Sequence, residues 1–182
     1  MLTEARILEC KDDEELFELL GLELTARLPN GAGSTYEEFD DYLARLRDLP
    51  VGLRAMESIY QLDVSLALDD LGWHFANWHN KQYCEETLRG LRELEAHEVA
   101  DIFDAAYTHA LCWWDKIGEL LEVDFDEFTT WYSGSEFEKV TMPLTRRLWA
   151  MCEGEEGKRK GILRFWAPYA RKYPHKVIMR MA

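Results

Sequence analysis

The chain lacks the segments that export or membrane insertion require. None of the apolar runs in its 182 residues approaches the roughly 20 residues of a membrane span. The N-terminal stretch MLTEARILECKDDEE carries acids where a signal peptide has a basic patch and an apolar stretch. From these two absences we expect a cytoplasmic protein.

Cysteine is scarce, and its spacing indicates neither a metal site nor a redox site. The four cysteines, Cys10, Cys84, Cys112 and Cys152, form no CxxC pair, and a disulfide framework is not expected in a chain of this size without export signals. Catalytic motifs are missing too, because there is no GxSxG, no P-loop and no GxGxxG. We therefore predict no catalytic residue, no cofactor and no metal site.

Acidic residues outnumber basic ones, and the two kinds are unevenly distributed. The formal net charge is −14. Residues 1–157 hold all 35 acids and 13 of the 21 Lys and Arg, a net of −22, whereas residues 158–182 hold the other 8 bases and no acid. An acidic surface repels nucleic acid and anionic membranes and attracts basic partners. The alternative is that the acidity only keeps the protein soluble. We divide the chain into an acidic helical domain, 1–157, and a basic, aromatic-rich C-terminal segment, 158–182.

Helical capping and periodicity run along almost the whole chain. Asp12 and Asp13 can cap a first helix, and Ser34 with Glu37 forms a capping box for the next. A helix from about Ser135 contains a proline, at which it kinks or restarts.

The pattern predicts how many helices the chain forms and how they are joined. The longest predicted helix spans 98–121, and the stretch 122–136 is interpreted as a linker that is turn-rich at its end. No alternating strand pattern competes with the helices. We predict an all-α fold, a single compact multi-helix domain of about seven or eight helices with a basic C-terminal helical tail.

The stretch LDDLGWHFANWHN concentrates acids, aromatics and histidines. His74 and His79 are five apart, about 140° around a helix, so they do not share a face. Asp70 and His74 have the spacing for a carboxylate–imidazole contact, and His109 and Cys112 lie three apart on one predicted helix face. Hydrogen bonding at the edge of the core is the favoured interpretation. The alternative is a small helical metalloenzyme or hydrolase that uses Asp70, His74, His79 or His109.

A longer run around this stretch resembles a known family. Residues 62–106 read LDVSLALDDLGWHFANWHNKQYCEETLRGLRELEAHEVADIFDAA: an acidic helix, a glycine and an aromatic, an aromatic-rich helix reaching an Asn, and two further helices. The run is similar to the central region of the DNA-mimic protein family, a set of small, acidic, all-helical bacterial proteins. The likeness is carried by Asp69, Asp70, Gly72, Trp73, His74, Phe75, Asn77 or Asn80, Leu91, Leu94, Ala96, Ala100 and Ala105.

The resemblance implies a protein that presents carboxylates in place of phosphates to the DNA-binding face of a basic partner. B-DNA carries one charge per about 3.4 Å of each strand. Acids three or four residues apart on a helix recur every roughly 4.5 to 6 Å. We expect Trp73, Phe75 and Trp78 to anchor the acidic helix ends to the core. The alternative is that each acidic group is merely a solvated face. The predicted acidic strip consists of Glu37, Glu38, Asp41, Asp69, Asp70, Glu122, Asp124, Asp126 and Glu127.

The basic segment 158–182 interleaves cations with aromatic rings. We expect it to dock on the acidic body, or on a second copy in a homodimer. If it covers the acidic strip, its deletion should tighten partner binding. The sequence therefore predicts a non-enzymatic interaction protein whose partner is a basic DNA-binding protein, with no direct binding of nucleic acid or membrane. The alternative is an immunity or antitoxin protein against a basic toxin nuclease.

Overall fold

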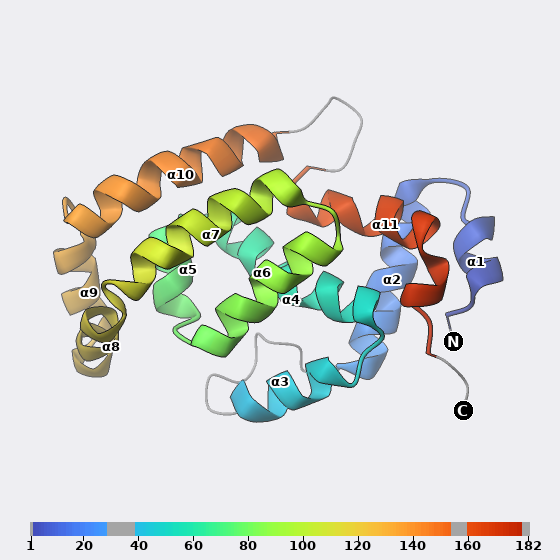
Figure 1. Cartoon of the computed structure of the whole chain (residues 1–182), viewed down its shortest axis with the longest axis horizontal. Helices are drawn as coiled ribbons and strands as arrows, with labels where there is room; N and C mark the ends of the chain where they lie inside the picture. Colours follow the sequence, from blue (N-terminus) through green and yellow to red (C-terminus); the bar gives the residue numbers. More distant parts are fainter. Residues whose placement is uncertain (1, 29–38, 154–159, 180–182) are drawn as a thin grey trace.

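The computed structural model describes residues 2–28, 39–153 and 160–179. Within these ranges the chain forms eleven α-helices and two short 3₁₀ helices, with no strand (Figure 1). The all-α prediction is confirmed, but the predicted count of seven or eight helices is too low. The elements are α1 (Glu4–Glu9), α2 (Asp13–Arg27), α3 (Phe39–Arg47), α4 (Val51–Leu68), α5 (Leu71–Asn77), α6 (Lys81–Glu93), α7 (His97–Leu111), α8 (Trp114–Val123), α9 (Phe125–Tyr132), α10 (Glu136–Cys152), η3 (Ile162–Phe165), α11 (Trp166–Lys172) and η4 (Pro174–Lys176).

The extra helices arise at breaks that the hydrophobic pattern does not reveal. The helix predicted over 98–121 is two helices, because the Cys112 and Trp113 N–H groups donate to carbonyls three residues back, at 3.1 and 2.9 Å. This tight turn separates α7 from α8. The predicted linker contains α9, whose N-cap is Asp124; its carboxylate accepts the Glu127 N–H at 2.9 Å.

Local capping signals predict the helix starts well. Asp12 caps α2 and Ser135 caps α10, each accepting a backbone N–H from the first turn. Helix α10 continues through Pro143 rather than restarting at it. The predicted capping box of Ser34 and Glu37 lies outside the described residues.

Helix α4 is the centre of the packing. It contacts α2, α3, α5, α6, α10 and α11. Helix α6 approaches it at Gly90, where a Cβ would lie 2.0 Å from the Ser58 hydroxyl. Glycine is therefore required for this close approach. None of the described helices is long and apolar enough to cross a membrane.

Residues from both ends of the chain enter the same hydrophobic core. Ile7 of α1 belongs to it, as do Leu163, Trp166 and Val177 of the C-terminal segment. The Trp166 ring stacks on Phe17 of α2 with centroids 5.0 Å apart. Figure 1 shows both termini at one end of the molecule, with α8 and α9 at the opposite end.

A candidate acidic interaction surface on α8 and α9

The acids of the predicted strip lie in several places. Asp41 is exposed in the first turn of α3, which lies away from α8 and α9 in Figure 1. Asp69 is exposed where α4 ends; partial burial, and then the neighbouring Asp70, raise the pKa of the Asp69 carboxyl above its ordinary value. Glu37 and Glu38 lie outside the described residues. The structure brings together the four acids of the former linker, which are Glu122, Asp124, Asp126 and Glu127.

Asp70 faces inward, which corrects its assignment to an outward-facing strip. It is the N-cap of α5, and Oδ1 accepts the N–H groups of Gly72 at 2.7 Å and Trp73 at 3.1 Å. The same oxygen accepts the Tyr132 hydroxyl at 2.8 Å. Because these three donors compensate the loss of water, the carboxylate is buried.

Hydrogen bonds around Asp70 connect α5, α9 and α10. The Tyr132 hydroxyl of α9 also lies 3.2 Å from the Thr141 hydroxyl of α10. The Thr145 hydroxyl accepts the Leu71 N–H at 3.1 Å. A Cβ on Gly72 would lie 2.3 Å from the Tyr132 hydroxyl oxygen, so only glycine allows this approach. These contacts fix α5, α9 and α10 relative to one another.

Aromatic rings support α9 from the side of α5. Trp73 stacks on Phe125 with centroids 6.0 Å apart and meets Phe128 edge-on at 4.9 Å. Phe128 is fully buried, whereas Phe125 is 50% exposed. Of the other two predicted anchors, Phe75 lies in the main core and Trp78 in a smaller cluster with Tyr83. An aromatic layer therefore lies directly beneath the first turn of α9.

Exposed acids follow one another along α8 and into the first turn of α9. Residues 114–132 contain six acids and one base, a net of −5. The base, Lys116, lies 3.9 Å from Glu119. On α8 the acids follow each other at four and three residues, a rise of roughly 4.5 to 6 Å per step. The α8–α9 acidic surface consists of Asp115, Glu119, Glu122, Asp124, Asp126 and Glu127, all of them exposed.

The distal part of this surface has no counter-charge among the described residues. Glu122, Asp124, Asp126 and Glu127 form no salt bridge with any residue that the structure describes. Val123 is 69% exposed between them, next to the half-exposed Phe125. Unpaired carboxylates around exposed apolar side chains are suited to a partner that brings cations and apolar area together.

The three histidines of interest have structural partners. His74 is fully buried, its Nδ1 lies 2.9 Å from the Ser65 hydroxyl, and burial lowers its pKa to about 3. The predicted Asp70–His74 contact is wrong, because the His74 ring meets Ser65 through Nδ1 and its Nε2 has no hydrogen-bond partner among the described residues. His79 stacks on a tryptophan and bonds its carbonyl through Nε2, and His109 stacks on a phenylalanine. Across 2–28, 39–153 and 160–179, no three His, Cys, Asp or Glu side chains are placed to hold a metal ion.

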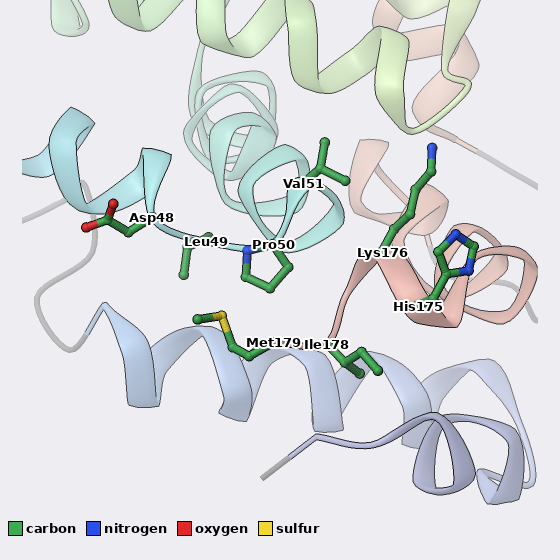
Figure 2. Close-up of a pocket in the computed structure, with 8 residues that line it drawn as sticks. All are labelled: Asp48, Leu49, Pro50, Val51, His175, Lys176, Ile178 and Met179. Carbon is green, nitrogen blue, oxygen red and sulfur yellow. The ribbon is translucent and has the colours of Figure 1, made fainter. Parts of the chain in front are cut away.

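A pocket of about 510 Å³ lies between the α3–α4 turn and η4. Figure 2 shows Asp48 and His175 on opposite sides of it, with Pro50, Ile178 and Met179 between them. The lining residue Lys176 is ion-paired with Glu93 at 2.8 Å. Because its acid and its histidine are separated, the pocket presents no pair of groups for acid–base chemistry.

No protein-family model, curated protein or solved structure matches the chain. The likeness of residues 62–106 to the DNA-mimic protein family stays a prediction, and the α8–α9 acidic surface lies outside those residues.

Proposed function

We propose that the protein is a non-enzymatic, cytoplasmic interaction protein whose α8–α9 acidic surface occupies the DNA-binding face of a basic protein. The observation that carries the proposal is that Glu122, Asp124, Asp126 and Glu127 form no ion pair within the part of the chain that the structure describes. A soluble fold can neutralise such acids internally, as this chain does elsewhere. Acids left without counter-charge, on helices held by buried rings and a buried carboxylate, form a preorganised anionic surface.

Two features support DNA mimicry in particular. The acids recur along α8 at a spacing comparable to that of successive phosphates, and they continue onto the first turn of α9. The aromatic layer of Trp73, Phe125 and Phe128 limits how far α9 can move. A fixed pattern of charge is what a DNA-binding face would recognise, since that face matches phosphate positions.

The basic C-terminal segment has a different role in this proposal. We infer that it supplies an internal counter-charge and leaves the α8–α9 acidic surface free. Its cations Arg171, Lys172 and Lys176 pair with acids of α2, of the α6–α7 connection and of the end of α6, respectively. The expectation that deleting the segment would uncover the acidic strip therefore has no support in these contacts.

The experiment is a pull-down from native lysate with the protein immobilised, compared with two matched variants. Variant one, Glu122→Gln/Asp126→Asn/Glu127→Gln, neutralises the surface but keeps the Asp124 cap. Variant two, Glu9→Gln/Glu98→Gln/Asp101→Asn, neutralises three exposed acids elsewhere and serves as the control.

We expect basic DNA-binding proteins to be retained by the wild type and the control, lost with the first variant, and released by short duplex DNA. Equal retention by all three proteins, or retention that duplex DNA does not reverse, would contradict the proposal. A retained toxin nuclease would point instead to an immunity protein with the same binding surface.

A further inference from the structure

Helix α10 lies at the edge of the molecule and is amphipathic. Its inner face buries Phe137, Thr141, Thr145 and Leu148 at helical spacing. Figure 1 shows α10 along the outer boundary, next to α7 and continuous with the α8–α9 end. Its other face is therefore turned to solvent in a single copy of the chain.

The solvent face of α10 carries exposed cations and apolar groups. We define the α10 basic stripe as Lys139, Val140, Pro143, Arg146 and Arg147, which are exposed and lie on one side of the helix because Pro143 is three or four residues from each of the others. Lys139 Nζ lies 2.6 Å from the Glu136 carboxylate, so the cations without a partner are the two arginines. Arg146 and Arg147 form no hydrogen bond or ion pair with the residues that the structure describes, and Val140 is 40% exposed.

These two arginines differ from most of the basic side chains around them. Five other arginines, and the lysines of α11 and η4, pair with carboxylates at 2.9 Å or closer. They are Arg27, Arg54, Arg89, Arg92, Arg171, Lys172 and Lys176. The Arg164 guanidinium donates to a backbone carbonyl instead.

We propose that the α10 basic stripe binds the α8–α9 acidic surface of a second copy of this chain. The two surfaces are consecutive in the chain, with three residues between the end of α9 and the start of α10. A patch that carries both signs side by side can be self-complementary about a two-fold axis, which is the commonest symmetry of homodimers. Each copy then contributes the stripe at one side of the interface and the acids at the other.

Helix geometry is compatible with this pairing. Arg146 lies ten residues into α10, about 15 Å from the end nearest α9. A two-fold arrangement in which the α8–α9 end of one copy lies beside the middle of α10 of the other brings the two surfaces together. Val140 and Pro143 of the stripe are then available to the exposed Val123 and Phe125 of the second copy.

Because the molecule is acidic, the α10 basic stripe is better suited to bind a second copy of the chain than nucleic acid or an anionic membrane. Two free arginines on a molecule of net charge −14 cannot offset its repulsion of nucleic acid or an anionic membrane. Two copies also repel each other, but that repulsion is screened beyond roughly 8 Å at physiological salt, whereas opposite patches meet at contact distance. The pairing goes beyond the proposed function, since it makes self-association a competitor of the basic partner.

The test is sedimentation equilibrium of four full-length proteins over a concentration series. Arg146→Glu/Arg147→Glu reverses the stripe, and Glu122→Lys/Glu127→Lys reverses the acidic surface. Lys11→Glu/Lys160→Glu reverses two exposed cations outside both surfaces and is the matched control. Circular dichroism of each variant establishes that its helices are intact.

We expect the wild type and the control to approach twice the chain mass of 21.4 kDa. Each reversed variant alone should raise the dimer Kd by about tenfold or more, because like charges then face each other. An equimolar mixture of the two reversed variants should restore the dimer, since both contacts regain opposite signs. A wild type that stays monomeric, or a mixture that stays monomeric, overturns the pairing. Either result leaves the lysate experiment on the basic partner unaffected.

Discussion

The two ends of the molecule differ in whether their acidic residues form ion pairs. At the end that holds both termini, cations of the C-terminal segment meet acids brought there by other helices. At the opposite end, the distal acids of α8 and α9 have no cation beside them among the described residues. The pairs at the first end are Arg171 with Asp13 at 2.9 Å, Lys172 with Glu95 at 2.8 Å and Lys176 with Glu93 at 2.8 Å.

The difference lies in which carboxylates form ion pairs within the described part of the chain. Where segments distant in sequence meet, this chain pairs its carboxylates, and two tyrosines also donate hydroxyl groups to Glu93 and Glu95. Unpaired acids close together repel one another and give nothing to the compact state. The partner proposed above would supply the cations that the fold does not bring to the α8–α9 acidic surface.

The largest expected effect tests whether the C-terminal segment is part of the core. Trp166→Ala removes a buried ring that stacks on Phe17, and it should lower the free energy of unfolding by about 3–5 kcal/mol. Phe125→Ala at the other end removes a half-exposed ring and should cost about 1 kcal/mol. Urea denaturation followed by circular dichroism measures both. Equal costs would show that the C-terminal segment is only loosely attached.

The next effect concerns pH and the buried His74. Its ring stays neutral in the folded protein because burial lowers its pKa from 6.5 to about 3. The unfolded chain binds a proton below about pH 6.5, so this group makes stability fall as pH decreases from about 6.5 towards 3, by about 1.4 kcal/mol per pH unit. His74→Leu should remove that part of the slope, seen in urea denaturation at pH 7 and at pH 5 (roughly 2 kcal/mol in total).

The matched control for this slope is His175→Leu, because His175 is exposed on η4. It should leave the pH dependence of the wild type intact. A His74→Leu protein with the wild-type slope would show that acid destabilisation comes from carboxyl groups alone.

A smaller change in the free energy of unfolding is expected from the loss of the Glu93–Lys176 ion pair. Burial raises the pKa of the Glu93 carboxyl, but hydrogen bonds from Lys176 and Tyr169 outweigh it and hold that pKa below its ordinary value. Its stabilisation is therefore present above the unfolded pKa and is lost as pH falls through the folded one. Glu93→Gln should cost about 1 kcal/mol at pH 7. Glu85→Gln, an exposed acid of the same helix, should cost nothing measurable.

The sequence predicts most of the fold, because helix signals are local. The cap at Asp12, the helix start near Ser135 and the all-α class depend on neighbouring residues, and all three are confirmed. Helix α9 lies within the stretch predicted as a linker. Asp124 followed three residues later by Glu127 is itself a capping signal for it. The break between α7 and α8 has no such signal, since the apolar seam continues through it.

The candidate site is less predictable, because exposure depends on distant partners. Asp69 and Asp70 are indistinguishable in sequence, yet Asp70 is buried by a hydroxyl 62 positions away on Tyr132. Exposure is also hard to predict in the C-terminal segment. Its basic composition suggests that it lies on the surface, but Trp166 and Tyr169 are buried. Whether an acid is paired or free is decided by tertiary contacts.

The smallest expected change in stability, that of neutralising acids of α8 and α9, is the most specific test of the difference between the two ends of the molecule. Glu122→Gln/Asp126→Asn/Glu127→Gln should alter the free energy of unfolding by no more than about 0.5 kcal/mol, because these acids have no ion pair to lose. At low salt their mutual repulsion is relieved, so a slight gain offsets the weaker interaction of Asp126 and Glu127 with the first turn of α9. Urea denaturation beside Glu93→Gln measures the contrast. If three neutralised acids at this end cost more than one at the other, the acids of α8 and α9 support the fold, and their lack of counter-charge would cease to indicate a partner.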